Sequence, residues 1–72
     1  MEKLKLNTLY KHKTNRDTAF EISSYEKDGK AFLMFYNTNS AKMTGKSIRS
    51  CYCGNGIFKL RPAKEYTKLE DK

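Results

Sequence analysis

The longest apolar run in the chain is Ala31–Asn37, which reads Ala-Phe-Leu-Met-Phe-Tyr-Asn. Its alternating positions are apolar on both sides, with Ala31, Leu33 and Phe35 on one side. A strand that is apolar on both faces is one that other parts of the protein cover on both sides. The run therefore predicts a central strand of a closed or sandwiched sheet.

Two shorter segments before this run also have the pattern of strands. Thr8–Lys13 and Thr18–Tyr25 alternate apolar and polar positions, and the turn-forming residues Thr14–Asp17 separate them. Asp28-Gly29 lies between the second segment and the central run. Because Asp-Gly between two strand-like runs is the strongest short-range signal for a hairpin, we expect these two strands to pair antiparallel.

After the central run, the pattern predicts a polar connection with one short helical turn, followed by two strands that a tight turn joins. In chain order these segments are the connection Thr38–Lys46 with its turn at Ser40–Met43, the strand Ser47–Cys53, the tight turn Gly54–Gly56 and the strand Ile57–Leu60. The last segment, Ala63–Leu69, fits either a helical turn or an edge strand.

Five short strands with tight turns fit an all-β fold, a small five-stranded antiparallel barrel in which closure removes exposed edges. In strand order and spacing this pattern resembles the SH3-like barrel, the fold of Tudor and KOW modules. A chain of this length allows one domain, so we expect a single barrel that spans residues 1–72, with Ala63–Leu69 as the candidate for a short helical turn near the C-terminus. The lysine-, asparagine- and tyrosine-rich composition is similar to that of small accessory proteins of phages. We take no functional residue from either resemblance.

A chain of 72 residues is predicted to have one small core, which could hardly enclose an active-site cavity of about 300 Å³. It has no P-loop, no glycine-rich nucleotide fingerprint and no H-E-x-x-H motif. We therefore expect a protein that is not an enzyme. No apolar run approaches the roughly 18 residues of a membrane span, and the N-terminus lacks the apolar stretch of a secretory signal. These features favour a cytoplasmic protein without a membrane partner.

Cys51 and Cys53 form a C-x-C pair, which in a strand would point both thiols to one face. A structural zinc site needs four ligands, and His12 is the only other good candidate. Since the set is one ligand short, we expect reduced thiols and no metal or other cofactor. A reactive-thiol or metal protein that uses these three residues remains the weakest alternative.

The strongest compositional signal is the charge. Fifteen Lys and Arg residues against eight Asp and Glu residues give a formal net charge of +7. No acidic residue occurs between Asp28 and Glu65, whereas seven basic residues do. Such segregation predicts a face of positive potential that suits phosphate groups or an acidic protein surface. Ordinary lysine-rich solubility would give the same total charge.

Small barrels bind single-stranded nucleic acid by stacking bases on exposed aromatic rings while a basic groove follows the backbone. Tyr10 and Tyr52 are expected to be the exposed rings, because their sequence neighbours are the most basic. A hairpin about Gly54–Gly56 would also bring Arg49 opposite Arg61, and such like charges are destabilising unless an anion lies between them. The residues predicted to contact nucleic acid, DNA or RNA, are Lys11, Lys13, Lys46, Arg49, Lys59, Arg61, Tyr10 and Tyr52.

The alternative is a phage-type protein-interaction module that binds and modulates a host bacterial protein. In that case the basic face would meet an acidic protein surface, and the loop Thr38–Gly45 would supply Met43 as an apolar anchor. The location would then be the host cytoplasm. Both hypotheses are compatible with a monomer or a homodimer.

Overall fold

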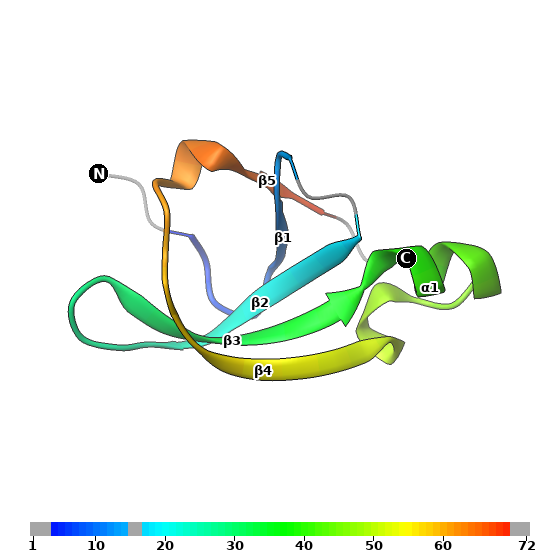
Figure 1. Cartoon of the computed structure of the whole chain (residues 1–72), viewed down its shortest axis with the longest axis horizontal. Coiled ribbons are helices and arrows are strands. Elements are labelled where there is room, and N and C mark those ends of the chain that lie inside the picture. The colour runs from blue at the N-terminus through cyan, green and yellow to red at the C-terminus, as the bar shows by residue number, and fades with distance from the viewer. Residues whose placement is uncertain (1–3, 15–16, 70–72) are drawn as a thin grey trace.

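The computed structural model describes residues 4–14 and 17–69, which form one antiparallel sheet with short helices between its strands (Figure 1). The elements are β1 (Leu9–His12), β2 (Thr18–Tyr25), β3 (Lys30–Asn37), α1 (Thr38–Thr44), the 3-10 helix η1 (Ile48–Ser50), β4 (Tyr52–Lys59), the 3-10 helix η2 (Ala63–Glu65) and β5 (Tyr66–Lys68). The prediction of a mostly β protein with five antiparallel strands is confirmed for the described residues. The predicted turn at residues 14–17 includes Asn15 and Arg16, which lie outside them.

The strand order is β4-β3-β2-β1-β5, so β4 and β5 are the two edges of an open sheet. The first four strands follow one another as a meander, and β5 returns to pair with β1. The sheet bends strongly, and the segment after β4 leads over to η2 and β5 (Figure 1). The predicted central strand, β3, does lie between two other strands.

The hairpin of β2 and β3 forms where the sequence predicted it. Asp28 and Gly29 both have positive φ, 60° and 73°, which is the backbone that a type I′ turn requires. The register places Phe20 opposite Phe35 and Ile22 opposite Leu33. Because directly opposite residues lie on the same face, these four side chains are directed to one side of the sheet.

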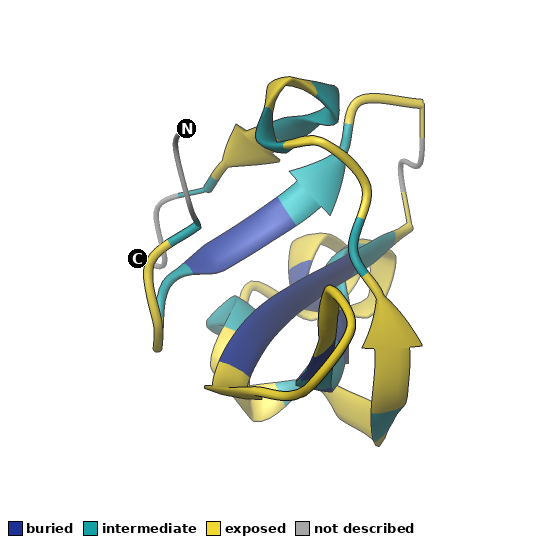
Figure 2. Cartoon of the chain, turned by 90° about the vertical axis from the view of Figure 1, so that its left-hand side faces the viewer, coloured by how far each residue is buried: buried dark blue, intermediate teal, exposed yellow. Residues whose placement is uncertain are grey.

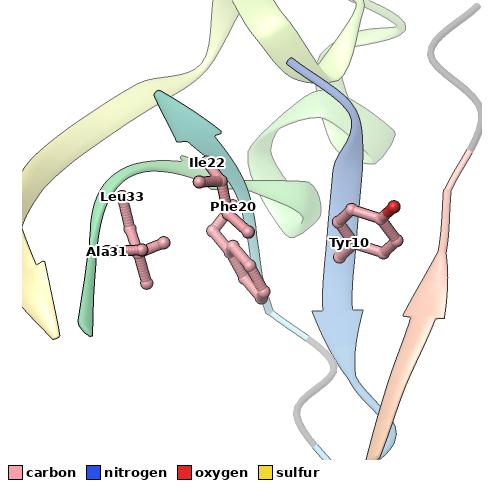
Figure 3. Packing of buried hydrophobic residues seen from close by; sticks show 5 residues of the cluster. All are labelled: Tyr10, Phe20, Ile22, Ala31 and Leu33. Carbon is pink, nitrogen blue, oxygen red and sulfur yellow. The ribbon is translucent and has the colours of Figure 1, made fainter. Parts of the chain in front are cut away.

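That side holds the hydrophobic core. Tyr10 from β1, Phe20 and Ile22 from β2, and Ala31 and Leu33 from β3 are buried together (Figure 3). Each large apolar side chain that is fully buried contributes roughly 1.5–3 kcal/mol. The core therefore depends on the three central strands, and it fixes which side chains of β3 and β4 lie on the opposite face.

The predicted pair of strands around Gly54–Gly56 is wrong, because Tyr52–Lys59 is one continuous strand that pairs with β3. The glycines have a different role from the predicted turn. A Cβ atom on Gly56 would lie 2.8 Å from Cε2 of Phe58, so glycine gives this ring space. Gly54 has a φ of 150° and lies at a bulge, where the register shifts between Phe35 and Tyr36.

The residues before β4 also differ from the prediction. Ser47–Cys53 was expected to be a strand, but it contains η1, and β4 begins only at Tyr52. Cys51 therefore lies outside the strand, and the argument that both thiols share a strand face does not apply. Both cysteines are free thiols.

The two predicted helical segments are present. The turn expected at Ser40–Met43 is part of α1, which begins after Asn37, whose Oδ1 accepts a hydrogen bond from the Ser40 backbone N–H at 2.9 Å. It ends at Gly45, which has a φ of 72°. At the C-terminal end, Ala63–Leu69 contains both of the expected alternatives, since η2 is followed directly by β5.

Candidate nucleic-acid interface

The sheet has a second face, opposite the core, which we call the outer face. Four pairs of directly opposite residues on β3 and β4 belong to it, because residues alternate between faces along a strand. The pairs are Lys30 with Lys59, Phe32 with Ile57, Met34 with Asn55, and Tyr36 with Tyr52. The bulge beside Cys53 keeps Tyr52 and Asn55 on the same side, and the Asn55 side-chain amide donates to the Tyr52 hydroxyl.

A buried carboxylate with several hydrogen-bond partners lies at one end of the outer face. Glu21 on β2 is only 8% exposed and lies opposite Met34. Its carboxylate accepts hydrogen bonds from Arg49 Nη1, at 2.6 Å, and from the Tyr36 hydroxyl. Arg49 Nη2 also donates to the backbone oxygen of Asn7, at 2.8 Å. The guanidinium thus connects η1 to β2 and to the segment before β1.

These contacts fix the protonation states at this end. Burial alone would raise the pKa of Glu21, but the hydrogen bonds from Arg49 and Tyr36 outweigh it and hold the pKa below its ordinary value. Burial and the hydrogen bond to Glu21 raise the pKa of Tyr36 to about 12. At neutral pH, Glu21 is therefore ionised, and its charge is matched by that of Arg49. The predicted anion-binding residue Arg49 already has an anionic partner within the fold.

At the other end of the outer face, Lys30 and Lys59 lie directly opposite each other on adjacent strands. Both are exposed, and neither forms an ion pair with another described residue. The segment between β2 and β3 contains two acidic residues, Asp28 and Glu26, whose backbone N–H donates to the Lys30 carbonyl at 2.8 Å. Its carboxylate accepts a hydrogen bond from the Ser24 hydroxyl at 3.0 Å.

Between the two ends, the outer face carries exposed aromatic and apolar side chains. Tyr52 is 48% exposed, as the sequence predicted, and Ile57 is 56% exposed. The Tyr52 ring makes an edge-to-face contact with Tyr36 at a centroid distance of 6.0 Å. β4 is exposed along most of its length (Figure 2). From Tyr52 to Lys59 the strand spans about 23 Å, at about 3.3 Å per residue.

The prediction that Tyr10 is exposed is wrong. Its side chain is only 7% exposed, and its ring lies 6.1 Å from that of Phe20 in the core. The Tyr10 hydroxyl accepts a hydrogen bond from the Lys5 backbone N–H at 2.9 Å. Strand alternation places Lys11 on the opposite side of β1 from Tyr10. The basic residues next to Tyr10 in the sequence therefore did not indicate that its ring is exposed.

The remaining predicted residues are spread over other parts of the molecule. Lys11 lines a shallow hollow of about 320 Å³ together with Asp17 and Lys42. Lys13 is exposed just after β1, and Lys46 is exposed between α1 and η1. The structure therefore brings Lys59, Tyr52 and Arg49 to one face and does not bring these three lysines to it.

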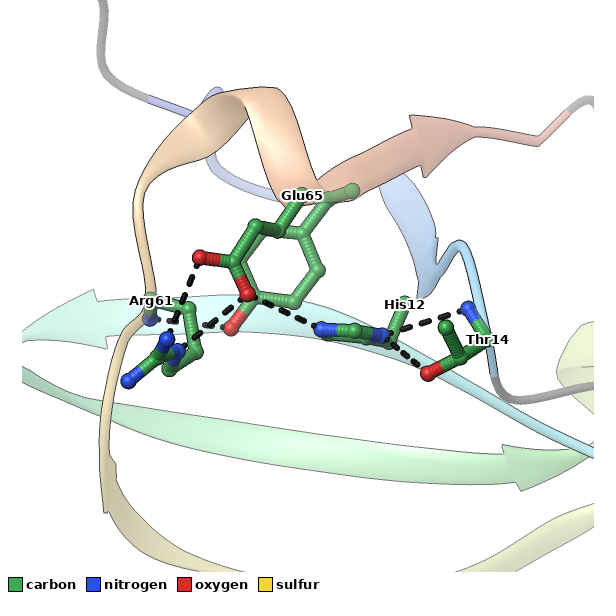
Figure 4. A network of polar contacts seen from close by, with 5 residues as sticks. His12, Thr14, Arg61 and Glu65 are labelled. Carbon is green, nitrogen blue, oxygen red and sulfur yellow. Dashed lines mark hydrogen bonds and ion pairs between the residues drawn. The ribbon is translucent and has the colours of Figure 1, made fainter.

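Arg61 is held by a carboxylate, like Arg49, and the predicted opposition of the two arginines is wrong. Its Nε and Nη2 atoms donate to the Glu65 carboxylate at 3.2 and 3.3 Å (Figure 4). The same carboxylate lies 3.1 Å from Nε2 of His12. Because the Thr14 backbone N–H donates to Nδ1 of His12, Nε2 carries the proton and donates to Glu65.

This network joins β1 to η2. Arg61 and, after it, His12 hold the pKa of Glu65 below its ordinary value. The His12 ring also makes an edge contact with Tyr66 at 5.6 Å. Among the described residues, no group of three or more His, Cys, Asp and Glu side chains is placed to hold a metal ion. The network thus accounts for His12 by its contacts with Glu65, Thr14 and Tyr66.

Sequence reasoning missed Lys30 as part of the site. It was one of the basic residues in the acid-free stretch, but it was not assigned a contact. Its position opposite Lys59 follows from the pairing of β3 with β4, which the predicted turn at Gly54–Gly56 concealed. The two lysines become neighbours only when residues 52–59 form one strand in the observed register with β3.

No family model, curated protein or solved structure matches this chain. None of the helices in residues 4–14 and 17–69 has the length and apolar character needed to cross a bilayer.

Proposed function

We propose that the protein is a non-enzymatic binding module that holds single-stranded nucleic acid on the outer face of β3 and β4. The observation that carries this proposal is the pairing of Lys30 with Lys59, without an acidic partner among the described residues, on the face where Tyr52 is exposed. Phosphate groups would lie at the lysine pair, and bases would stack toward Tyr52.

The lysine pair favours an anionic ligand for an energetic reason. Like charges directly opposite each other on neighbouring strands destabilise the fold by about 0.2–1 kcal/mol. Natural proteins keep such unfavourable local arrangements mainly where function requires them. A phosphate group between Lys30 and Lys59 would replace the repulsion with two attractive contacts, and lysine binds phosphate as a compact point charge.

The exposed aromatic ring favours a single strand. A base that stacks on an aromatic side chain contributes about 1–3 kcal/mol, and this energy is available only where the base is not already stacked within a duplex. Tyr52 offers such a contact on the same face as the lysines, and the exposed Ile57 adds apolar surface beside it. The strand length of about 23 Å suits a short segment of about 4 nucleotides, the lower end of sites on small barrels.

We also infer that the sheet is an SH3-like barrel that is open between β4 and β5. A four-stranded meander with β5 returning to the side of β1 supports this assignment, as does η2 between the last two strands. On the face proposed for binding, the outer-face residues of β4 and Lys30 at the start of β3 are exposed to solvent.

Fluorescence anisotropy with a labelled deoxythymidine strand of about 12 nucleotides tests the function. We expect binding at low salt, weaker binding to a duplex of equal length, and a loss of about 1–2 kcal/mol in the Tyr52→Ala variant. Heparin, a polyanion without bases, should bind wild type and Tyr52→Ala equally. Met43→Ala, which changes an exposed apolar residue on α1, is the matched control.

Two results would contradict the proposal. One is the absence of oligonucleotide binding at low salt. The other is an equal loss of heparin and oligonucleotide binding in Tyr52→Ala, because stacking would then contribute nothing.

We propose as a second candidate the interaction module that binds an acidic protein surface. The supporting observation is Met43, which is 78% exposed on α1 and adjoins the exposed Lys42. Affinity capture from nuclease-treated bacterial lysate with wild type and Met43→Asp tests this candidate. A protein that is retained by wild type and lost with Met43→Asp supports it, and identical sets of retained proteins contradict it.

A further inference from the structure

A pocket of about 670 Å³ lies where the β2–β3 turn meets the segment between β4 and η2. Pockets of about 300–1,000 Å³ are the size that binds small molecules. The small core was expected to be hardly able to enclose a cavity of about 300 Å³, and this pocket is not enclosed by the core but is open to solvent. Its lining residues come from three separate segments, so the fold and not one loop creates it.

The inner wall of the pocket is apolar. Leu4 and Leu60, which pack against the core cluster, lie beside Pro62 and Ala63. Tyr25 adds an aromatic ring, and its hydroxyl donates to the backbone oxygen of Leu4. A flat ring system is the kind of group that such a wall of aliphatic, proline and tyrosine side chains accommodates.

The rim of the pocket is mostly basic. Lys30, Arg61 and Lys64 line it, and Glu26 is the one acid among its lining residues. Arg61 is held by Glu65, whereas Lys30 and Lys64 form no ion pair with another described residue. The two lysines are therefore the cations available to an anion, and the Glu26 carboxylate is an acceptor suited to a sugar hydroxyl.

Lys30 connects this pocket to the outer face. It lines the pocket, and it also lies opposite Lys59 on the adjacent strand. An anionic chain that follows the outer face from Tyr52 to Lys59 therefore reaches the mouth of the pocket at its basic end. Because the outer face continues into the pocket at Lys30 and the rim is basic, the pocket favours a nucleotide over an uncharged apolar ligand.

We propose that the pocket accepts one nucleotide unit, with its base against the wall of Leu60 and Pro62 and its phosphate between Lys30 and Lys64. This inference rests on the proposed function, because it makes the pocket the place where a bound strand inserts its terminal nucleotide. The proposal also gives Lys64 a role as a phosphate contact, because Lys64 lines the pocket and is not one of the paired residues of the outer face.

Adenosine monophosphate, adenosine and ribose 5-phosphate are the probes that test the pocket, with the full chain observed by amide NMR. We expect adenosine monophosphate to shift the amides of Gly29, Lys30 and Ala63, and to bind about tenfold more tightly than either fragment. Against adenosine, a factor of this size corresponds to one charge-assisted hydrogen bond to the phosphate, and against ribose 5-phosphate it corresponds to the contact of the base with the apolar wall. Equal binding of ribose 5-phosphate would overturn the inference, because the site would then recognise only the anion.

Two variants separate the pocket from general electrostatic attraction. Lys64→Glu should weaken binding of adenosine monophosphate about tenfold or more, whereas Lys68→Glu, the same charge change on β5, should alter it less than twofold. Ala63→Arg, which places a bulky side chain at the wall, should abolish the shifts at Gly29 while the sheet amides keep their wild-type positions. Equal effects of Lys64→Glu and Lys68→Glu would overturn the inference.

The inference and the proposed function fail in different ways. If adenosine monophosphate shifts only outer-face amides such as Asn55 and Ile57, the pocket assignment is wrong and strand binding stands. If an oligonucleotide does not bind at low salt, the proposed function fails, and the inserted terminal nucleotide fails with it. If the oligonucleotide binds and adenosine monophosphate displaces it from Gly29, both are supported.

Discussion

The two ends of the outer face both carry positive charge, but the fold treats these charges differently. At one end, Arg49 donates to the buried carboxylate of Glu21 and to a backbone oxygen, and Tyr36 donates to the same carboxylate. At the other end, Lys30 and Lys59 lie side by side without an ion pair to any described residue. The first set of charges is satisfied within the molecule, and the second is not.

The difference indicates which cations stabilise the fold and which are available to a ligand. Removing a partner from a buried pair leaves a charge without compensation, which is strongly destabilising. Removing one of two like charges on adjacent strands relieves repulsion instead. Net charge alone does not separate these cases, so the sequence count of +7 is a poor guide to the site. A cation that has an anionic partner within the fold stabilises the fold, and a cation without one is available to a ligand.

The largest effect is expected from Arg49→Ala. The variant leaves Glu21 buried with only the Tyr36 hydroxyl, so the free energy of unfolding should fall by about 2–3 kcal/mol. This is below the value for a fully buried pair, because the Arg49 side chain is 40% exposed. Urea unfolding measures it.

The double variant Arg49→Ala with Glu21→Gln is the control for this comparison, and it should recover part of the stability because no uncompensated charge remains. A loss below about 0.5 kcal/mol in Arg49→Ala, typical of a surface residue, would show that the two ends do not differ.

Acid should weaken the Glu21 end and spare the lysine end. The pKa of Glu21 is lower in the folded than in the unfolded chain, so its contribution to stability is complete above its ordinary pKa of 4.5. This contribution is lost as the pH falls through the pKa of Glu21 in the folded chain. Glu65 contributes in the same direction, because Arg61 and His12 lower its pKa.

Urea unfolding between neutral pH and about pH 3 should therefore show stability falling below about pH 4.5, with a smaller fall in Glu21→Gln. Identical pH profiles for wild type and Glu21→Gln would show that the ionised Glu21 carboxylate does not stabilise the fold.

The smallest effect is expected from Lys59→Gln, and its sign matters more than its size. Relief of the repulsion with Lys30 should raise the free energy of unfolding by about 0.2–1 kcal/mol, while affinity for an oligonucleotide falls. Lys68→Gln on β5 is the matched control and should change neither quantity appreciably. A loss of stability in Lys59→Gln would mean that this lysine has a structural role.

The sequence predicted those parts of the fold that depend on local signals. The Asp28-Gly29 turn and the alternation of Thr18–Tyr25 identify the β2–β3 hairpin, and the helical turn predicted at Ser40–Met43 lies within α1. These features are readable because turn and cap chemistry depends on neighbouring residues.

Features that depend on a distant partner could not be predicted. Gly54 and Gly56 have the sequence pattern of a turn, and only their pairing with Phe35 and Leu33 on β3 places them in a strand. The partner of Arg49 is Glu21, 28 residues earlier in the chain. For the site, Tyr52 and Lys59 were predicted, but their relation to Lys30 required the β3–β4 register.

The most direct test of the account measures oligonucleotide affinity between about 50 and 200 mM salt for wild type and for Lys30→Ala with Lys59→Ala. Each phosphate contact to a single strand contributes about 0.7 to the slope of log affinity against log salt. Because one phosphate is proposed to lie between Lys30 and Lys59, we expect the double variant to lower the magnitude of this slope by about 0.7, while Lys42→Ala with Lys68→Ala leaves it near the wild-type value. Equal slopes for the two double variants would contradict it.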